Sequence, residues 1–241
     1  MIIYIFAFIT GCSLGSFMNV VISRNDWYKG RSRCDNCGYT LKWFDLIPLV
    51  SFIALGGRCR KCKKPISASH IFSELCMGAA FLAAPYLISK FGYTEGPIYA
   101  YGIIFLSIFA IEDIKWQAIH SWLLNLGVIS SAMVRAYLIY SENGVRDAVL
   151  FLIIISGLKL VFSVLGKYIT KLGAGDLDIF LVIYSICGLY RGLISITLAA
   201  VLGCLIYLPQ IFTGRMDRKK TVPFAPLLFA GTVICYLIMK G

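Results

Sequence analysis

Four cysteines near the N-terminus are spaced as ligands of one metal ion. Cys34 and Cys37 form one C-x2-C pair, and Cys59 and Cys62 form a second pair after 21 intervening residues. Two such pairs at this separation are typical of a tetrahedral zinc site. Four thiolates fill the coordination sphere and leave no position for a reactive water. We therefore expect a structural zinc ion that positions a loop and takes no part in a reaction.

Two aspartates, Asp113 and Asp176, are the second candidate for chemistry, because each borders a long apolar run. A charged group so close to hydrocarbon is costly and usually has a function. Two neighbouring carboxylates are sufficient for peptide hydrolysis, since one keeps its proton while the other takes a proton from water. Gly173 and Gly175 precede Asp176 and would let a substrate peptide approach the backbone closely. The alternative is that both aspartates are interfacial carboxylates that face water.

The elements that carry these residues are expected to be membrane helices. The chain has 241 residues, of which 59% are hydrophobic, and its mean hydropathy is +0.80. Soluble domains are about 45–50% apolar, and a helix needs about 20 apolar residues to cross a bilayer. We therefore predict an all-α polytopic membrane protein with about eight transmembrane helices. The apolar stretches are residues 2–22, 70–90, 97–113, 118–138, 147–167, 178–193, 194–211 and 223–239.

The distribution of basic residues predicts the orientation of these helices. The formal net charge is +11, and the sequence contains 23 Lys and Arg. With eight spans, 17 of those 23 fall on the side that carries segment 24–68 and loop 212–222. Positively charged loops are retained in the cytoplasm, so we expect both aspartates on that side and both termini outside. Because orientation accounts for the basic residues, we expect membrane lipid as a partner and no nucleic acid.

We divide the sequence into a first transmembrane helix (1–24), a cytoplasmic four-cysteine zinc-binding module (25–68) and a transmembrane core (69–241) that carries both aspartates. The module is polar and too small to bury a core, so metal binding would supply its folding free energy. Its cysteines should be reduced in the cytoplasm. Glu74, near the start of the second predicted span, is expected to line a substrate or cofactor cleft. The alternative is an interfacial residue that faces the module.

Several motifs spread over most of the chain match one known family. Asp113, six residues before Ile119, matches that family's first catalytic aspartate, and residues 173–176 (GAGD) are similar to its GxGD motif. Glu74 aligns with a glutamate that is usual in its second span. The other matches are residues 15–24 (GSFMNVVISR), 31–37 (RSRCDNC), 47–51 (IPLVS), 57–62 (GRCRKC) and 65–67 (PIS). Together they resemble the type IV prepilin peptidases, which are bacterial membrane aspartic proteases.

This resemblance implies a reaction and a location. It implies cleavage of prepilins and pseudopilins at the cytoplasmic face of the bacterial inner membrane, after a glycine that precedes the hydrophobic pilin segment. The associated processes are type IV pilus assembly, protein secretion and competence. Members with a cysteine module often also methylate the new N-terminus with S-adenosylmethionine, and only the resemblance implies that activity here. The alternatives are a peptidase without methyltransferase activity, a proton-coupled transporter and a zinc-tethered pilus-assembly scaffold.

Three positions depart from the family's pattern, although none removes a catalytic aspartate. His120 stands where proline is usual, Asp178 where a basic residue is common, and Asp45 where asparagine is frequent. Prepilin leaders are short and basic, so acidic groups near the aspartates should offset repulsion by the basic face. We predict that Glu112 and Asp178 bind the leader, because neither has an obvious partner in the sequence. The alternative is that both face water.

Overall fold

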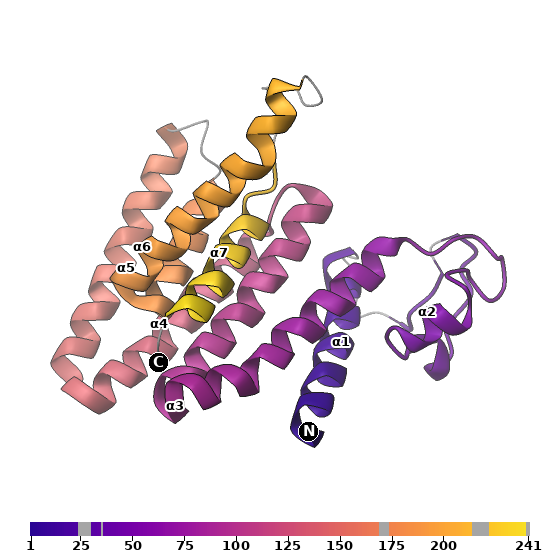
Figure 1. Cartoon of the computed structure of the whole chain (residues 1–241), viewed down its shortest axis with the longest axis horizontal. Helices are drawn as coiled ribbons and strands as arrows, with labels where there is room; N and C mark the ends of the chain where they lie inside the picture. The colour runs from indigo at the N-terminus through magenta and orange to yellow at the C-terminus, as the bar shows by residue number, and fades with distance from the viewer. Residues whose placement is uncertain (24–29, 35, 169–173, 214–221, 240–241) are drawn as a thin grey trace. The chain divides into compact units, whose positions relative to one another are not determined.

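The computed structural model describes residues 1–23, 30–34, 36–168, 174–213 and 222–239. Within these ranges the regular secondary structure is helical apart from two isolated β-bridges, which confirms the predicted all-α class. The elements in chain order (Figure 1) are α1 (Ile2–Ser23), the 3-10 helix η1 (Trp43–Leu46), α2 (Val50–Ala54), α3 (Ala68–Trp116), α4 (Ser121–Asn143), α5 (Val145–Tyr168), α6 (Ala174–Phe212) and α7 (Ala225–Ile238).

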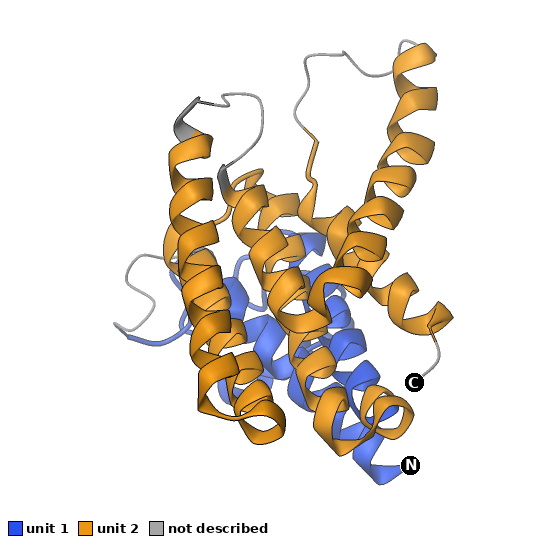
Figure 2. Ribbon diagram, turned by 90° about the vertical axis from the view of Figure 1, so that its left-hand side faces the viewer, with its two compact units in different colours: residues 1–86 blue, residues 87–241 orange. Residues whose placement is uncertain are grey.

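The chain forms two compact units, which Figure 2 shows in different colours. Unit 1 is Met1–Tyr86 and unit 2 is Leu87–Gly241, so the boundary lies inside α3. Unit 1 contains the cysteine segment together with α1 and the beginning of α3, whereas unit 2 contains Asp113 and Asp176. The three-part division made from the sequence stays a prediction.

Five of the described helices are long and apolar enough to cross a membrane, namely α1, α3, α4, α5 and α6. The prediction of a multi-pass membrane protein is therefore confirmed. With 49 and 39 residues, α3 and α6 are each about twice the length that one crossing needs. Each of these two helices is interrupted at one glycine, Gly92 in α3 and Gly188 in α6. The number of eight spans stays a prediction.

Both interruptions are backbone conformations that favour glycine. Gly92 has φ 80° and ψ 178°, and Gly188 has φ 71° and ψ 178°. A residue with a Cβ atom is strained at such positive φ angles. Beyond Gly92 the chain folds back tightly on itself. A Cβ atom at Gly96 would lie only 2.5 Å from the Cα atom of Ile88. In the sequence, the predicted stretches 178–193 and 194–211 meet a few residues beyond Gly188.

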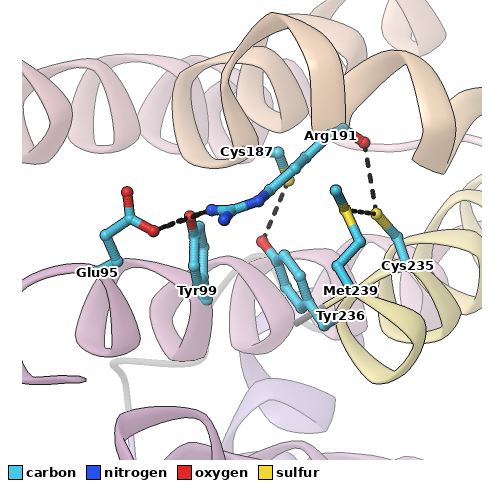
Figure 3. Close-up of polar contacts among 7 residues, drawn as sticks. All are labelled: Glu95, Tyr99, Cys187, Arg191, Cys235, Tyr236 and Met239. Atoms are coloured by element: carbon cyan, nitrogen blue, oxygen red, sulfur yellow. Dashed lines mark hydrogen bonds and ion pairs between the residues drawn. The ribbon is translucent and has the colours of Figure 1, made fainter. Parts of the chain in front are cut away.

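A polar cluster ties the two interruptions of unit 2 to α7 (Figure 3). Glu95, just after the break in α3, accepts a hydrogen bond from Arg191, just after the break in α6, at 2.9 Å. Tyr99 bonds both of these side chains. On α7, the Tyr236 hydroxyl contacts the Cys187 sulfur at 3.1 Å. These contacts hold the part of α3 that follows Gly92 and the part of α6 that follows Gly188 in fixed positions relative to each other and to α7.

In unit 1, small residues let α1 approach α3 closely. Cβ atoms at Gly11 and Gly15 would lie 2.5 Å from the carbonyl oxygen of Met77 and 2.8 Å from that of Ser73. This four-residue glycine spacing is a common way to bring membrane helices together. The buried Asn19 side chain adds a hydrogen bond to the Ser73 hydroxyl at 2.6 Å. α1 is thus fixed against the first turns of α3.

In unit 2, α6 packs against α4, α5 and α7, and α4 also packs against α5. Glycines again mark the closest approaches. A Cβ atom at Gly231 of α7 would lie 2.8 Å from the Ala199 nitrogen of α6 and still closer to the Ser195 carbonyl oxygen. Backbone atoms cannot yield as a flexible side chain can, so this contact requires glycine. By contrast, nothing lies within 4 Å of a Cβ atom at Gly157 of α5.

These two glycines give a matched test of the α6–α7 packing. Gly231→Ala should lower the free energy of unfolding by about 1–3 kcal/mol, because it overpacks a tight contact. Gly157→Ala should leave stability unchanged or raise it by up to about 1 kcal/mol, because alanine favours an open helical position. Thermal unfolding of the detergent-solubilised variants measures both. Equal melting temperatures for the two variants would contradict the close approach of α7 to α6.

Candidate active site and metal centre

Two similar turns in unit 1 present the four cysteines. In the first turn, the amide of Cys34 donates to the carbonyl of Tyr39 at 2.9 Å. In the second turn, the amide of Cys59 donates to the carbonyl of Lys64, also at 2.9 Å. One β-bridge closes each turn. The residue after each second cysteine has a positive φ angle, 67° at Gly38 and 57° at Lys63. Glycine adopts this conformation without strain, whereas Lys63 must be held in it by the surrounding contacts.

The four sulfur atoms fit a tetrahedral metal site. All of them lie within 4.8 Å of one another, and the Cys34 and Cys62 sulfurs are 4.0 Å apart. Four sulfurs at the usual Zn–S distance of about 2.3 Å would be about 3.8 Å apart. Hydrogen bonds from the backbone amides of Cys62 and Lys61 lower the pKa of the Cys59 thiol to about 6, which favours the thiolate. All nine cysteines are free, so no disulfide competes for these sulfurs.

Polar residues next to the cysteines are fixed by local bonds in unit 1. Asp45 is nearly fully buried and accepts from Arg60 at 2.9 Å. Glu74 is also buried, at 8% exposure, and its Oε2 atom accepts from the backbone amide of Leu49 at 2.9 Å. Leu49 precedes α2 and has a φ of 60°. Glu74 therefore stabilises the strained start of α2 beside the module.

Asp113 lies in the last turn of α3 and is only 9% exposed. Its Oδ2 atom accepts a hydrogen bond of 2.9 Å from the backbone amide of Ala225, the first residue of α7. The first amides of a helix have no partner within the helix and carry partial positive charge. The start of α7 therefore holds this carboxyl group in place and offsets part of the cost of burying its charge.

Asp176 lies in the first turn of α6, where the helix dipole also favours negative charge. It is half-buried, and it is close enough to Asp113 for the two charges to interact. Gly175, the residue before Asp176, packs against α4, because a Cβ atom at Gly175 would lie 3.3 Å from the Leu124 side chain. Gly173, the other predicted glycine of this segment, lies outside the described residues. The structure thus brings together two aspartates that are far apart in the sequence.

Glu112 and Asp178 have no obvious partner in the sequence, but the structure gives each of them one. Glu112 is fully buried, and its Oε1 atom contacts the His120 ring and accepts from the His120 backbone amide at 3.3 Å. Its Oε2 atom has no hydrogen-bond partner among the described residues. Asp178 forms an ion pair of 2.5 Å with Lys159 of α5. Their binding of a substrate stays a prediction, but each is now seen to be held by a cation or a potential cation.

Sequence reasoning missed the groups that hold the acids. The amide of Ala225 could not be assigned, because a backbone donor has no sequence motif of its own. The nearest hint is Pro226, since proline is common in the first turn of a helix and marks where α7 begins. Lys159 was visible as a lone charge in an apolar run, but its partner lies on another helix.

Comparison with known proteins gives consistent matches. Residues 9–88 match the model of the Bacterial Peptidase A24 N-terminal domain. A prepilin leader peptidase/N-methyltransferase of Burkholderia pseudomallei (strain 1026b) is 30% identical over 94% of this chain and 82% of its own length. The protein of that name in Bacillus subtilis (strain 168) is 28% identical over 95% of this chain and 92% of its own length.

A Myxococcus xanthus protein of the same name is 33% identical over 61% of this chain, and the match spans 44% of that relative. No solved structure matches the chain. The family assignment therefore rests on the relatives that align over nearly the whole chain, such as those of Burkholderia pseudomallei and Bacillus subtilis.

The metal site makes a direct prediction. Protein purified without added metal should contain about one zinc per chain, with Zn–S distances of about 2.3 Å by X-ray absorption. Cys62→Ser should lose the metal and make segment 30–67 sensitive to protease before unit 2, because metal binding supplies the folding free energy of the module. Cys204→Ser, at an exposed cysteine of α6, is the control and should retain both zinc and protease resistance. Full zinc content in Cys62→Ser would contradict the assignment.

Proposed function

Because the chain belongs to the prepilin leader peptidase/N-methyltransferase family, we propose that Asp113 and Asp176 act as one acid–base pair that cleaves the leader peptide of prepilins and pseudopilins. The observation that carries this proposal is that Asp113, at the end of α3, and Asp176, at the start of α6, lie in unit 2 near enough for their charges to interact. The family assignment favours hydrolysis over the transporter and scaffold alternatives.

The proposed reaction needs only the two carboxyl groups and a water molecule. Two carboxylates that share a site titrate as a unit, so one proton stays on the pair. The ionised member takes a proton from water, and the protonated member polarises the scissile carbonyl and later protonates the leaving amine. The start of α7 holds Asp113 in place through Oδ2.

The proposed zinc ion has no step in this reaction. Four thiolates would complete its coordination and leave no position for water. Cys34, Cys37, Cys59 and Cys62 would hold it in unit 1, where it orders the module. Gly173 and Gly175 are proposed to let the substrate backbone approach Asp176.

The proposed setting is the bacterial inner membrane. Several helices of the chain are membrane-spanning by length and composition. We propose that the module and both aspartates face the cytoplasm and both termini lie outside, because 17 of the 23 basic residues would then be cytoplasmic. The substrate's hydrophobic segment would remain in the lipid while its leader reaches the aspartates.

The relatives' names also include N-methyltransferase. We propose S-adenosylmethionine as the methyl donor of a second activity on the newly formed N-terminal amine. When bound, S-adenosylmethionine would supply the methyl group of its sulfonium to that amine, and the amine would lose one proton in exchange.

The acid–base pair predicts the outcome of two substitutions. Asp113→Asn and Asp176→Asn should each reduce leader cleavage by at least about 10²–10⁴-fold, because an amide keeps the shape but cannot transfer the proton. Asp147→Asn, at an exposed aspartate in the first turn of α5, is the matched control and should cleave normally. Cleavage is measured on a purified prepilin in detergent. Wild-type rates in either active-site variant would refute the pair.

The Asp178–Lys159 ion pair predicts an effect on leader charge. Asp178→Asn removes an acid and leaves Lys159 unpaired, so the apparent KM for a lysine-containing leader should rise about 2- to 5-fold. The KM for a leader with neutral residues should change less, with kcat similar for both.

The double variant Asp178→Asn/Lys159→Met should return the two KM values toward each other, because it removes the unmatched positive charge. Steady-state curves on two synthetic substrates measure the difference. An equal rise in KM for both leaders in the single variant would rule out a charge-reading role for Asp178.

A further inference from the structure

Glu112 is a buried acid that the proposed hydrolysis does not use. It immediately precedes Asp113 near the end of α3, and its side chain is fully buried. Its Oε2 atom has no hydrogen-bond partner among the described residues. A buried carboxylate is costly unless it is paired and hydrogen-bonded, so an incompletely satisfied one at this position calls for a functional explanation.

Glu112 and Asp113 hold the end of α3 to two different helices. Consecutive side chains on a helix point about 100° apart, so the two acids face different neighbours. Asp113 accepts from the Ala225 amide at the start of α7, at 2.9 Å. Glu112 contacts His120, the residue that caps the start of α4, through both the imidazole Nδ1 atom and the backbone amide. The turn that carries Asp113 is therefore fixed on two sides.

The contact between Glu112 and His120 closes a short loop that contains Asp113. Within this loop the Gln117 amide donates to the Asp113 carbonyl oxygen at 2.9 Å, and Gln117 has a φ of 50°. Such an angle is strained for a residue with a Cβ atom and persists only where the surrounding contacts hold it. Because the Glu112–His120 contact joins the two ends of the loop, it supplies part of that restraint.

The burial of Glu112 favours a role that acts through Asp113 over direct contact with a leader peptide. The Glu112 side chain exposes none of its surface, whereas the His120 side chain is 47% exposed. A leader side chain would have to displace the imidazole before it could reach the carboxyl group. A contact hidden from the substrate can still affect the reaction, because moving a reacting group by about 1 Å can cost about 100-fold in rate.

We propose that Glu112 and His120 form a positioning pair that holds the Asp113 carboxyl group where it can act together with Asp176. The inference rests on the proposed function, since it takes Asp113 to act on the scissile bond. It gives Glu112 a different role from the leader binding predicted from the sequence, and steady-state kinetics distinguish the two roles.

Two substitutions of Glu112 separate its oxygen from its charge. Glu112→Gln keeps an acceptor for the His120 amide, so kcat for leader cleavage should fall less than about threefold. Glu112→Ala removes the acceptor and should lower kcat about 10- to 100-fold. KM should stay within about twofold for a lysine-containing leader and for a neutral leader. Glu142→Gln, at an exposed glutamate of α4, is the control and should leave both constants unchanged.

A graded series at His120 tests the other half of the pair. His120 has a φ of −61°, which proline can adopt, so His120→Pro removes the backbone donor and the imidazole without changing that angle. His120→Ala removes only the ring, and His120→Asn keeps a side-chain donor near the position of Nδ1. We expect kcat to be highest for asparagine, lower for alanine and lowest for proline, about 10- to 100-fold below wild type.

Combining the two changes shows whether they act through one contact. His120→Pro should cost less than about a further twofold in kcat when Glu112 is already alanine, because both changes remove the same interaction. Losses that multiply, or unchanged kcat in both single variants, would overturn the proposal. A rise in KM for the lysine-containing leader alone, with kcat unchanged, would also overturn it. If Glu112→Ala does not fold, the His120 series decides, because it alters a half-exposed residue.

Hydrogen–deuterium exchange of the detergent-solubilised protein separates this proposal from the proposed hydrolysis. The Gln117 amide, which bonds the Asp113 carbonyl, should exchange at least about tenfold faster in Glu112→Ala than in wild type. Faster exchange in a protein that cleaves no leader even as wild type would refute the aspartate pair and support the restraint on Asp113. Cleavage that depends on Asp113, with neither faster exchange nor lower kcat in these variants, would overturn the positioning pair alone.

Discussion

Negative charge near hydrocarbon has to be stabilised, and unit 2 does this with the amino ends of its helices. Asp113 accepts from the first amide of α7, and its neighbour Glu112 accepts from the backbone amide of His120, just before α4. Asp176 lies in the first turn of α6. Three helix starts therefore lie near the carboxylates around the end of α3, and each supplies partial positive charge. The packing of α6 against α4 and α7 keeps these helix starts in place.

The three departures from the family pattern obey the same constraint. Asp45 is paired with Arg60, His120 contacts Glu112, and Asp178 is paired with Lys159. In each case the unusual residue has a partner of complementary charge or a potential one, so none of them leaves an uncompensated buried charge, which would be costly. The two units also divide the chemistry. Unit 1 holds the cysteine cluster and a cavity that Glu74 lines, whereas unit 2 holds the acid pair. The proposed metal binding and the proposed hydrolysis would thus depend on different side chains.

Much of this arrangement could be predicted from the sequence, and the rest could not for physical reasons. The spacing of Cys34, Cys37, Cys59 and Cys62 predicts one cluster, because both pairs form similar local turns. Hydropathy predicts membrane helices, because a helix that crosses the bilayer core must present apolar side chains to the lipid and satisfy its own backbone hydrogen bonds. The break at Gly188 was misplaced, since an apolar run looks the same on both sides of a bend. The partners of Glu112 and Asp178 were missed because they depend on a helix start and on a neighbouring helix. The cavity was invisible for the same reason, as its walls come from three separate segments.

The central claim is that Asp113 and Asp176 act on the same scissile bond. A structure of the protein with a leader peptide in which a hydroxyl-bearing isostere replaces that bond would test it most directly, because the hydroxyl occupies the position of the attacking water. The account predicts that this hydroxyl lies within about 2.6–3.2 Å of one carboxylate oxygen from each aspartate. An isostere that contacts only one of the two aspartates, or that binds in unit 1 away from both, would contradict it.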